Sequence, residues 1–409
     1  MKLWIKYLIG CLLGFLAATV IPTEVLQSKG ILEFLTTLSI NAGRYILIPL
    51  LFFSVTIAVC KLRETKQLFR VALLSVLGIV LSTVLFTGIG AASVLLIKLP
   101  RIPISIDRIT ETVSFDVKDM ILKLFPVNGF DALKDGAYLL PLLVFAGFAG
   151  AGCAAEKSIA KPAVSVIDSL SGVCYVVLHF FTDMIAIGLI AITCSWAITY
   201  REIYASGTFN SLFVMLFIDF LLIAAGIYPL LLRLICKEKH PYKVLYASIA
   251  PIIAAFFSGD TNFALITALR PVKESLGVKR RVGTVVQPVF AIFARGGAAL
   301  TTTISFVLIL RSYSSMGISA DDIMWICGMS ILLSFVLGTS TTGGTYTSIM
   351  VMCSMYGRGK EAGYLLLKPA MPVICAFAAA IDVVTMIFAS YIIAHRVKCI
   401  DQKTLKQYI

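Results

Sequence analysis

Long apolar runs, each close to the thickness of a bilayer, constrain this chain more than any other feature. A helix needs about 20 mostly apolar residues to cross the hydrocarbon core. Such runs occur near residues 4–21, 36–60, 68–97, 138–154, 161–198 and 209–236. Hydrophobic residues make up 59% of the 409 residues and charged residues only 14%, whereas an average soluble domain has about 25% charged residues. The sequence therefore predicts an all-α, polytopic membrane protein, and excludes a disordered chain, a disulfide scaffold and a nucleic-acid-binding protein.

The positive net charge of +13 comes from loops rich in Lys and Arg. In membrane proteins such loops lie mainly on the cytoplasmic side. If the N-terminus is cytoplasmic, alternating spans bring the basic clusters of 61–70, 157–161, 233–243, 270–281 and 396–406 to that side. This predicts a multi-pass protein of the cytoplasmic (inner) membrane with both termini in the cytoplasm. The ten cysteines form no CxxC pair and the three histidines lie far apart in the sequence, so we expect neither a metal nor another cofactor.

The apolar pattern changes after residue 245, because residues 246–310 and 323–395 are repeatedly interrupted by polar residues. The interruptions are Phe257–Phe263 and Gly338–Thr345, and the apolar flanks of each are too short to cross a membrane. Non-helical backbone at membrane depth occurs only where protein or a water-filled cavity satisfies its hydrogen bonds. The pattern therefore predicts two re-entrant hairpins with polar tips, which together with eight full spans leave both termini on one side. Ordinary loops outside the membrane are the alternative.

Each interrupted segment continues into a long apolar helix with an unusual polar residue inside it. The helix near 282–310 contains Arg295-Gly296-Gly297, and the helix near 366–395 contains Asp382. Paired broken helices in two corresponding halves are typical of secondary transporters with inverted repeats, whose substrate lies where the hairpins meet. The N-termini of half-helices favour anionic groups, because their backbone N–H groups are free and the helix dipole is positive there.

Four segments of the chain resemble the dicarboxylate/amino acid:cation symporter family, which includes the glutamate transporters. They are the second span at Asn41–Lys61 with its Pro49–Phe53 core, the first hairpin at Ala255–Leu265, the hairpin-to-helix connector at Glu274–Pro288, and the second hairpin at Gly338–Gly344. The resemblance implies eight helices, two oppositely oriented hairpins, a homotrimer and an elevator-type motion. It also implies a symporter for a small organic anion or amino acid, of the dicarboxylate, glutamate and aspartate class.

The same resemblance implies that the chain divides into a scaffold and a moving transport domain. The scaffold would comprise helices 1 and 2 (residues 1–67) and helices 4 and 5 (138–208), with residues 98–137 as an extracellular loop. The transport domain would comprise helix 3 (68–97), helix 6 (209–245), hairpin 1 with helix 7 (246–310), and hairpin 2 with helix 8 (311–395). Residues 396–409 would form a cytoplasmic tail.

Two departures from the family pattern concern the ion and the substrate. The family's seventh helix carries Asn-Met-Asp-Gly-Thr, whose oxygens help to hold sodium, where this chain has Ala294–Ala298. Sodium needs several oxygen ligands and an adjacent guanidinium repels it, so we expect that sodium site to be lost. Aligned without a gap, Asp382 matches the Asp that receives the substrate amino group, and Thr385 replaces the arginine that binds the substrate side-chain carboxylate. With a gap, Asp382 matches an Asn instead, and the arginine is missing in either register.

The candidate site therefore centres on charged residues of the two interrupted segments. We expect Arg295 to be a fixed cation in place of the lost ion, paired with Asp260, Asp382 or a substrate carboxylate; a structural ion pair without a ligand is the alternative. A carboxylate removed from water can hold a proton, so Asp260 or Asp382 can couple transport to protons, and the sequence leaves proton and sodium coupling open. The predicted coupling residues are Asp260, Arg295 and Asp382. The predicted substrate-binding residues are Ser258, Asp260, Thr261, Asn262, Arg295, Thr339, Ser340, Thr341, Thr342, Gly343, Gly344, Asp382 and Thr385.

Other polar residues in the spans are expected to have lesser roles. We expect Arg44 to extend to the membrane interface, and His179, Asp183 and Asp219 to pair or cap locally, with a proton relay as the alternative. The expected partners are a small organic anion or amino acid, the lipid bilayer and two further copies of the chain in a homotrimer. No nucleic acid is expected.

Several competing functions remain open at this stage. On the same fold, an uncoupled exchanger, a channel-like protein or a neutral amino acid transporter would give the same pattern of spans. A sensor that binds without transporting would also keep the fold. A membrane-embedded enzyme is disfavoured, because the sequence has no nucleophile–base pair, metal-spaced histidine cluster or phosphate loop.

Overall fold

The chain is predominantly α-helical in the part that the computed structural model describes. These residues are 2–21, 30–97, 99–103, 126, 128–134, 139–313, 318–337, 344–357 and 359–401. Within them, extended pairing is limited to one isolated antiparallel bridge between Val278 and Ile400. The all-helical prediction is therefore confirmed.

The described helices follow one another in an order that matches the predicted spans closely. The first part contains α1 (Leu3–Val20), α3 (Ile31–Tyr45), α4 (Leu47–Glu64), α5 (Leu68–Leu96), the short 3₁₀ helix η1 (Asp131–Leu133), α7 (Leu139–Ala155) and α8 (Lys157–Ala205). The middle contains α9 (Asn210–Leu221), the π-helical turn η2 (Leu222–Ile227), α10 (Tyr228–Ile235), α11 (Tyr242–Ser258) and α12 (Thr261–Glu274). The last part contains α13 (Arg280–Phe293), α14 (Gly296–Tyr313), α15 (Ala320–Val336), α16 (Thr345–Tyr356), the 3₁₀ helix η4 (Gly363–Ala370) and α17 (Met371–Arg396).

Seven helical segments among the described residues are long and apolar enough to cross a membrane. They are Leu3–Val20, Ile31–Glu64, Leu68–Leu96, Lys157–Ala205, Asn210–Ile235, Arg280–Tyr313 and Gly363–Arg396. The apolar helices α7 and α11 are shorter, with 17 residues each. A chain with this many apolar helices of bilayer length is a multi-pass membrane protein, as predicted.

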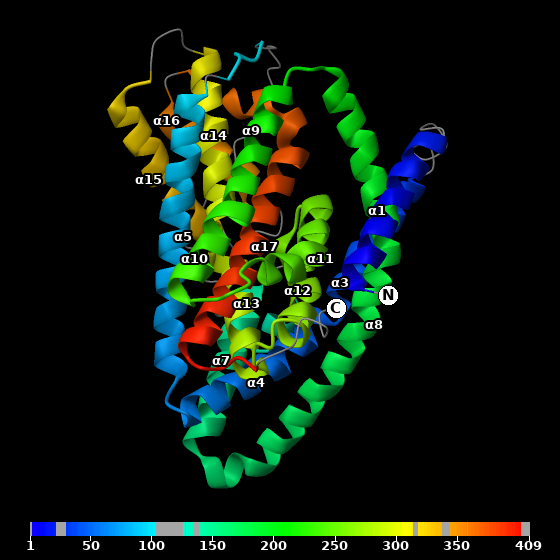
Figure 1. Cartoon of the computed structure of the whole chain (residues 1–409), viewed down its shortest axis with the longest axis vertical. Coiled ribbons are helices and arrows are strands. Elements are labelled where there is room, and N and C mark those ends of the chain that lie inside the picture. Colours follow the sequence, from blue (N-terminus) through cyan, green and yellow to red (C-terminus); the bar gives the residue numbers. More distant parts are fainter. Residues whose placement is uncertain are drawn as a thin grey trace.

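The long helix α8 forms one side of the molecule, where it arches away from the main bundle and packs against α1 and α3 (Figure 1). Small residues allow this close packing. A Cβ added at Gly10 of α1 would lie 2.3 Å from the Ala186 carbonyl oxygen of α8, and one added at Gly14 would lie 1.8 Å from Thr193 Oγ1. Glycines spaced four apart bring helix backbones together in a membrane, where packing rather than water exclusion drives association.

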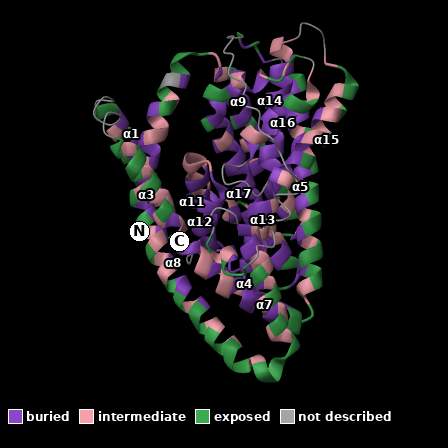
Figure 2. Cartoon of the chain, turned by 180° about the vertical axis from the view of Figure 1, so that it is seen from behind, coloured by how far each residue is buried: buried purple, intermediate pink, exposed green. Residues whose placement is uncertain are grey.

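The centre of the main bundle consists of α13, α14 and α17, which are buried along almost their whole length (Figure 2). By contrast, many apolar side chains of α5 are exposed on the outside of the bundle. Exposed apolar side chains are stable next to lipid, whereas the central helices must satisfy their polar groups within the protein. The polar residues of α14 and α17 therefore need partners from neighbouring helices.

Two breaks in the central helices give the candidate site its shape. Helices α11 and α12 form a hairpin that turns at Gly259, whose φ of 64° lies in the left-handed region that favours glycine. The sequence predicts one continuous helix near 282–310, but the structure differs. Helix α13 ends at Phe293 and α14 begins at Gly296, so Ala294 and Arg295 form a non-helical break.

Candidate functional site

The tip of the first hairpin is organised around Asp260, which caps α12. Its Oδ1 accepts a hydrogen bond from the Asn262 backbone N–H at 2.9 Å, and its Oδ2 accepts one from the Phe263 N–H at 3.3 Å. Ser258 Oγ donates to the Ala254 carbonyl oxygen at 2.6 Å. These bonds satisfy backbone groups that a helix end would otherwise leave unpaired, so the carboxylate of Asp260 is held in one orientation.

Asp260 also forms an ion pair with Arg44, the last-turn basic residue of α3. The side chain of Asp260 is only 6% exposed and that of Arg44 is 24% exposed. The expectation that Arg44 extends to the membrane interface is therefore wrong, because its guanidinium turns inward to a carboxylate that lies 216 residues further along the chain. The pair links α3, in the predicted scaffold, to the tip of the first hairpin.

The break between α13 and α14 places a second charge pair in the centre of the bundle. Arg295 is only 2% exposed and is the largest side chain that the described core encloses. Its Nη1 lies 4.0 Å from Asp382 Oδ2 of α17, and Asp382 Oδ1 accepts a hydrogen bond from the Gly297 N–H at 2.6 Å. The sequence left Asp260, Asp382 and a substrate carboxylate open as partners of Arg295. The structure places Asp382 in ion-pair contact with it.

Glycine is required at position 297, because α14 and α17 meet there without room for a side chain. A Cβ at this position would lie 2.4 Å from the Ala378 carbonyl oxygen and 2.9 Å from Asp382 Oδ1. Atoms at these separations overlap sterically. The close approach lets the first-turn N–H groups of α14 reach the Asp382 carboxylate, so the positive end of the helix dipole faces a negative charge.

The N-termini of two half-helices are therefore both occupied by carboxylates of the chain itself. Asp260 lies at the N-terminus of α12 and Asp382 at that of α14. Arg44 and Arg295 balance these two negative charges. The sequence predicted anion-favouring N-termini for the half-helices of the hairpins. The structure adds that one of them, that of α12, already holds an internal anion, and so does the N-terminus of α14 at the break that the sequence did not predict.

The remaining predicted site residues are distributed between the first hairpin, α17 and the second hairpin. Thr261 is buried, and its Oγ1 donates to the Ala291 carbonyl oxygen of α13 at 3.4 Å. Thr385 is buried one turn beyond Asp382, where its Oγ1 donates to the Ile381 carbonyl oxygen of its own helix at 2.8 Å. Gly344 precedes the N-terminus of α16 with a φ of 62°. The predicted residues Thr339, Ser340, Thr341, Thr342 and Gly343 lie outside the described residues.

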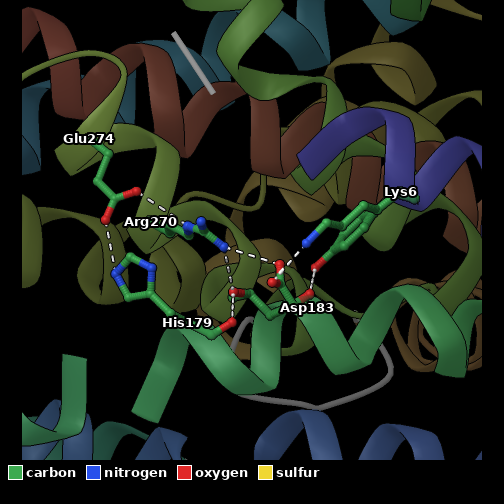
Figure 3. Close-up of polar contacts among 7 residues, drawn as sticks. Lys6, His179, Asp183, Arg270 and Glu274 are labelled. Atoms are coloured by element: carbon green, nitrogen blue, oxygen red, sulfur yellow. Dashed lines mark hydrogen bonds and ion pairs between the residues drawn. The ribbon is translucent and has the colours of Figure 1, made fainter. Parts of the chain in front are cut away.

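A charged network, which the sequence did not predict as a unit, connects the base of the first hairpin to α8 and α1 (Figure 3). Asp183 of α8 pairs with Lys6 of α1 at 2.8 Å and with Arg270 of α12 at 3.2 Å. Glu274 lies 3.2 Å from Arg270 and 2.9 Å from Nε2 of His179. The basic and acidic residues at 270–274 are visible in the sequence, but their partners Asp183 and His179 lie about 90 residues away along the chain.

Asp219 accepts a hydrogen bond from Ser93 Oγ at 3.0 Å. Within the described ranges, His, Cys, Asp and Glu side chains nowhere gather in a group of three that could hold a metal ion. The polar groups of the candidate site are thus arranged as charge pairs and capped helix ends.

Comparison with known proteins decides the class of this protein. The sequence pattern of the sodium:dicarboxylate symporter family matches residues 3–396. The chain belongs to this family. This family is described as one of sodium:dicarboxylate symporters, that is, of membrane transporters rather than enzymes. The family resemblance in the sequence is thereby confirmed over almost the whole chain.

A curated relative gives a second, weaker comparison. The human neutral amino acid transporter A is 21% identical over 218 residues, which are 53% of this chain and 41% of that protein. The match thus spans less than half the length of the relative.

Proposed function

We propose that the chain is a secondary active symporter that moves a small organic anion or amino acid by an elevator-type alternating-access mechanism. In this proposal the protein has eight spanning helices and two re-entrant hairpins, α11–α12 and α15–α16, and forms a homotrimer. Helices α1, α3, α4, α7 and α8 would belong to the scaffold. Helix α5 and the segment from α9 to α17 would move as the transport domain.

The observation that carries the proposal is the buried pair of Arg295 and Asp382 at the break between α13 and α14. In the sodium:dicarboxylate symporter family the sequence at this break contributes oxygens to sodium. Here a guanidinium occupies the position and is itself neutralised by Asp382 at 4.0 Å. A second cation beside Arg295 would be repelled strongly in a site of low dielectric constant. We therefore propose that Arg295 replaces the sodium of this site.

The substrate would bind between the tip of the first hairpin, the break at Arg295 and the N-terminus of α16. Ser258, Asp260, Thr261 and Asn262 would line one side. Asp382 and Thr385 would line the second, and Thr339 to Gly344 would close the third. The N-terminus of α16 supports this placement, because it has no acidic residue in its first turn and its N-cap residue gives no side-chain hydrogen bond, so it favours an anionic group.

Charge balance favours an amino acid with one carboxylate over a dicarboxylate. The two arginines at the proposed site, Arg44 and Arg295, are each paired with an aspartate. Among the described residues, Arg295 is the only Lys or Arg whose side chain is buried, and the substrate-binding arginine of the family's eighth helix is missing, with Thr385 in its place in an alignment without a gap. A dicarboxylate would therefore bring a second negative charge without a spare cation. The name of the human relative, a neutral amino acid transporter, agrees with this second candidate substrate class.

The proposal is tested by uptake into proteoliposomes. Labelled glutamate, aspartate, neutral amino acids and C4-dicarboxylates are offered with a sodium gradient, a proton gradient or neither. We expect saturable uptake that does not require sodium. Strictly sodium-dependent uptake would contradict the replacement of the ion by Arg295, and binding without uptake would favour a sensor.

A variant of Arg295 and a matched control make the uptake experiment specific to this residue. Arg295→Met should abolish uptake without making it sodium-dependent, because a methionine supplies neither the positive charge nor the oxygen ligands of sodium. Arg70→Met, which removes an exposed arginine of α5, serves as the control and should leave uptake unchanged. Normal uptake by Arg295→Met would remove the reason for assigning Arg295 to the site.

A further inference from the structure

A cationic cavity lies apart from the candidate site, where α4, α8, α12 and α13 converge toward the lower end of the molecule in Figure 1. Its volume is about 340 Å³, which falls in the range of roughly 300–1,000 Å³ typical of small-molecule sites. Its wall is formed by Ser54, Ile57, Ala58, Lys61, Asp168, Lys273, Arg280, Arg281 and Thr284. The lining thus combines apolar residues, two hydroxyl groups and five charged side chains.

The charges of this lining do not balance. Four of the lining residues are Lys or Arg, and Asp168 is the only acid among them. Asp168 is shared, since its Oδ2 lies 2.7 Å from Lys61 Nζ and its Oδ1 lies 2.7 Å from Arg280 Nη2. One carboxylate therefore serves two of the four cations, and the cavity keeps a large excess of positive charge.

The other two cations have no carboxylate partner among the described residues. The ammonium of Lys273 lies 4.6 Å from the centre of the Tyr175 ring, which holds it at the cavity by a cation–π contact. Arg281 directs Nη2 to the Cys399 sulfur at 3.1 Å, and its Nε is buried without a hydrogen-bond partner. An unpaired buried donor costs free energy unless a ligand accepts from it.

The backbone adds to the positive potential. Arg280, Arg281 and Thr284 belong to the first two turns of α13, whose first turn contains no acidic residue. The N-cap residue Lys279 also gives no side-chain hydrogen bond to this helix end. The positive end of the helix dipole therefore has no acidic residue in its own first turn and no side-chain cap to neutralise it, and the nearby Asp401 is paired with Lys279 at 3.3 Å.

We propose that this cavity binds the phosphate ester group of an anionic lipid headgroup. A phosphate presents several acceptor oxygens, which suit a site with donors from α4, α12 and α13 better than a single carboxylate does. Basic pockets between membrane helices are a recurring mode of binding to anionic headgroups. Because α4 and α8 contribute to one wall and α12 and α13 to the other, a bound phosphate would join the predicted scaffold to the predicted transport domain.

Calorimetric titration of the full chain in a neutral detergent tests the proposal. The three probes are short-chain phosphatidylglycerol, short-chain phosphatidylcholine and inorganic phosphate. We expect phosphatidylglycerol to bind and phosphatidylcholine not to bind. If inorganic phosphate binds as tightly as phosphatidylglycerol, the phosphate site is supported and its natural ligand is a soluble phosphate. Weaker binding of inorganic phosphate supports the lipid.

Two variants with opposite expected effects make the result specific. Lys273→Met keeps the aliphatic stem over Tyr175 but removes the charge, so the dissociation constant of phosphatidylglycerol should rise roughly tenfold or more. Asp168→Asn removes the only negative charge of the lining, so binding should become severalfold tighter. Lys161→Met, which removes an exposed charge of α8 outside the cavity, is the matched control and should bind as the wild type does.

The proposal is overturned if phosphatidylglycerol binds no more tightly than phosphatidylcholine and inorganic phosphate does not bind. It is also overturned if Lys161→Met weakens binding as much as Lys273→Met does, because the effect would then be general surface attraction. Weaker binding by Asp168→Asn, in a variant whose melting temperature shows that it is folded, would contradict the assignment of the cavity. None of these outcomes depends on the identity of the transported substrate.

Discussion

The ion pair between Arg44 and Asp260 gives the sharpest test of how the first hairpin is held. Asp260→Asn keeps a side chain that can cap α12 but removes the negative charge that faces Arg44. Removal of one partner from a fully buried pair costs about 3–5 kcal/mol. Because 24% of the Arg44 side chain is exposed and water can stabilise the remaining charge, we expect a smaller loss of about 2 kcal/mol in the free energy of unfolding.

A double-mutant cycle isolates the pair from other effects of each substitution. Arg44→Met, Asp260→Asn and the double variant are unfolded by titration with sodium dodecyl sulfate in mixed micelles, and helix content is followed by circular dichroism. We expect a coupling free energy of about 2 kcal/mol, because the double variant leaves no unpaired charge behind. A coupling below about 0.5 kcal/mol would refute the reasoning, since that is the size expected for an exposed pair.

Two controls distinguish the contribution of the ion pair to stability from that of the helix cap, and the effect of burial from that of solvent exposure. Asp260→Ala removes both the charge and the cap, and should cost about 1 kcal/mol more than Asp260→Asn. Asp131→Asn breaks the pair of Asp131 with Lys134, whose side chains are 44% and 75% exposed, and should change the stability by less than about 0.5 kcal/mol. Equal losses for the buried and the exposed pair would show that burial is not the deciding factor.

Three further predictions follow from other contacts. Gly297→Ala forces a Cβ against α17, so we expect a loss of about 1–3 kcal/mol of stability and no uptake; a stable, active variant would contradict the close approach. Asp183→Asn should cost less than about 1 kcal/mol, measured by the same unfolding titration, because its carboxylate is 43% exposed. Burial raises the pKa of Glu238, but its hydrogen bonds from Lys243 and Tyr391 outweigh this and hold the pKa below its usual value. A lowered pKa in the folded state stabilises the protein above the unfolded-state pKa, and this contribution is lost as the pH falls through the folded value. Tyr391→Phe should therefore move the pH at which the melting temperature falls under acid conditions to a higher value. An unchanged dependence of the melting temperature on acid pH would count against this contact.

The positions of the spanning helices could be predicted from the sequence with small errors. The run near 68–97 is α5 at Leu68–Leu96, and the run near 209–236 contains α9 to α10, which end at Ile235. The prediction works because every helix that crosses the bilayer needs about 20 or more mostly apolar residues, and such a run is visible in the sequence alone. The polar interruption at 257–263 likewise predicted a hairpin turn, and the structure places that turn at Gly259.

The partners of the charged residues could not be predicted in the same way. Arg295 was identified as unusual, but its pairing with Asp260 or Asp382 remained open, and Arg44 was assigned to the interface. Its true partner, Asp260, is 216 residues away. Which distant charges meet depends on how α3, α12, α14 and α17 pack, and no local pattern encodes that packing.

The sequence by itself determined the class of this protein. Hydropathy, basic loops and paired interruptions are local properties, and each segment interacts with the bilayer through its own composition. It also determined which residues were anomalous for an apolar helix, since a buried charge must have a partner or a function. Only the tertiary structure decided which partner each charge has and that two half-helix ends are already occupied by aspartates. The same is true of the cationic cavity, whose lining brings α4 and α8 together with α12 and α13, which lie far from them in the sequence. Ion pairs depend on separations of a few ångströms between side chains, and packing alone fixes those separations.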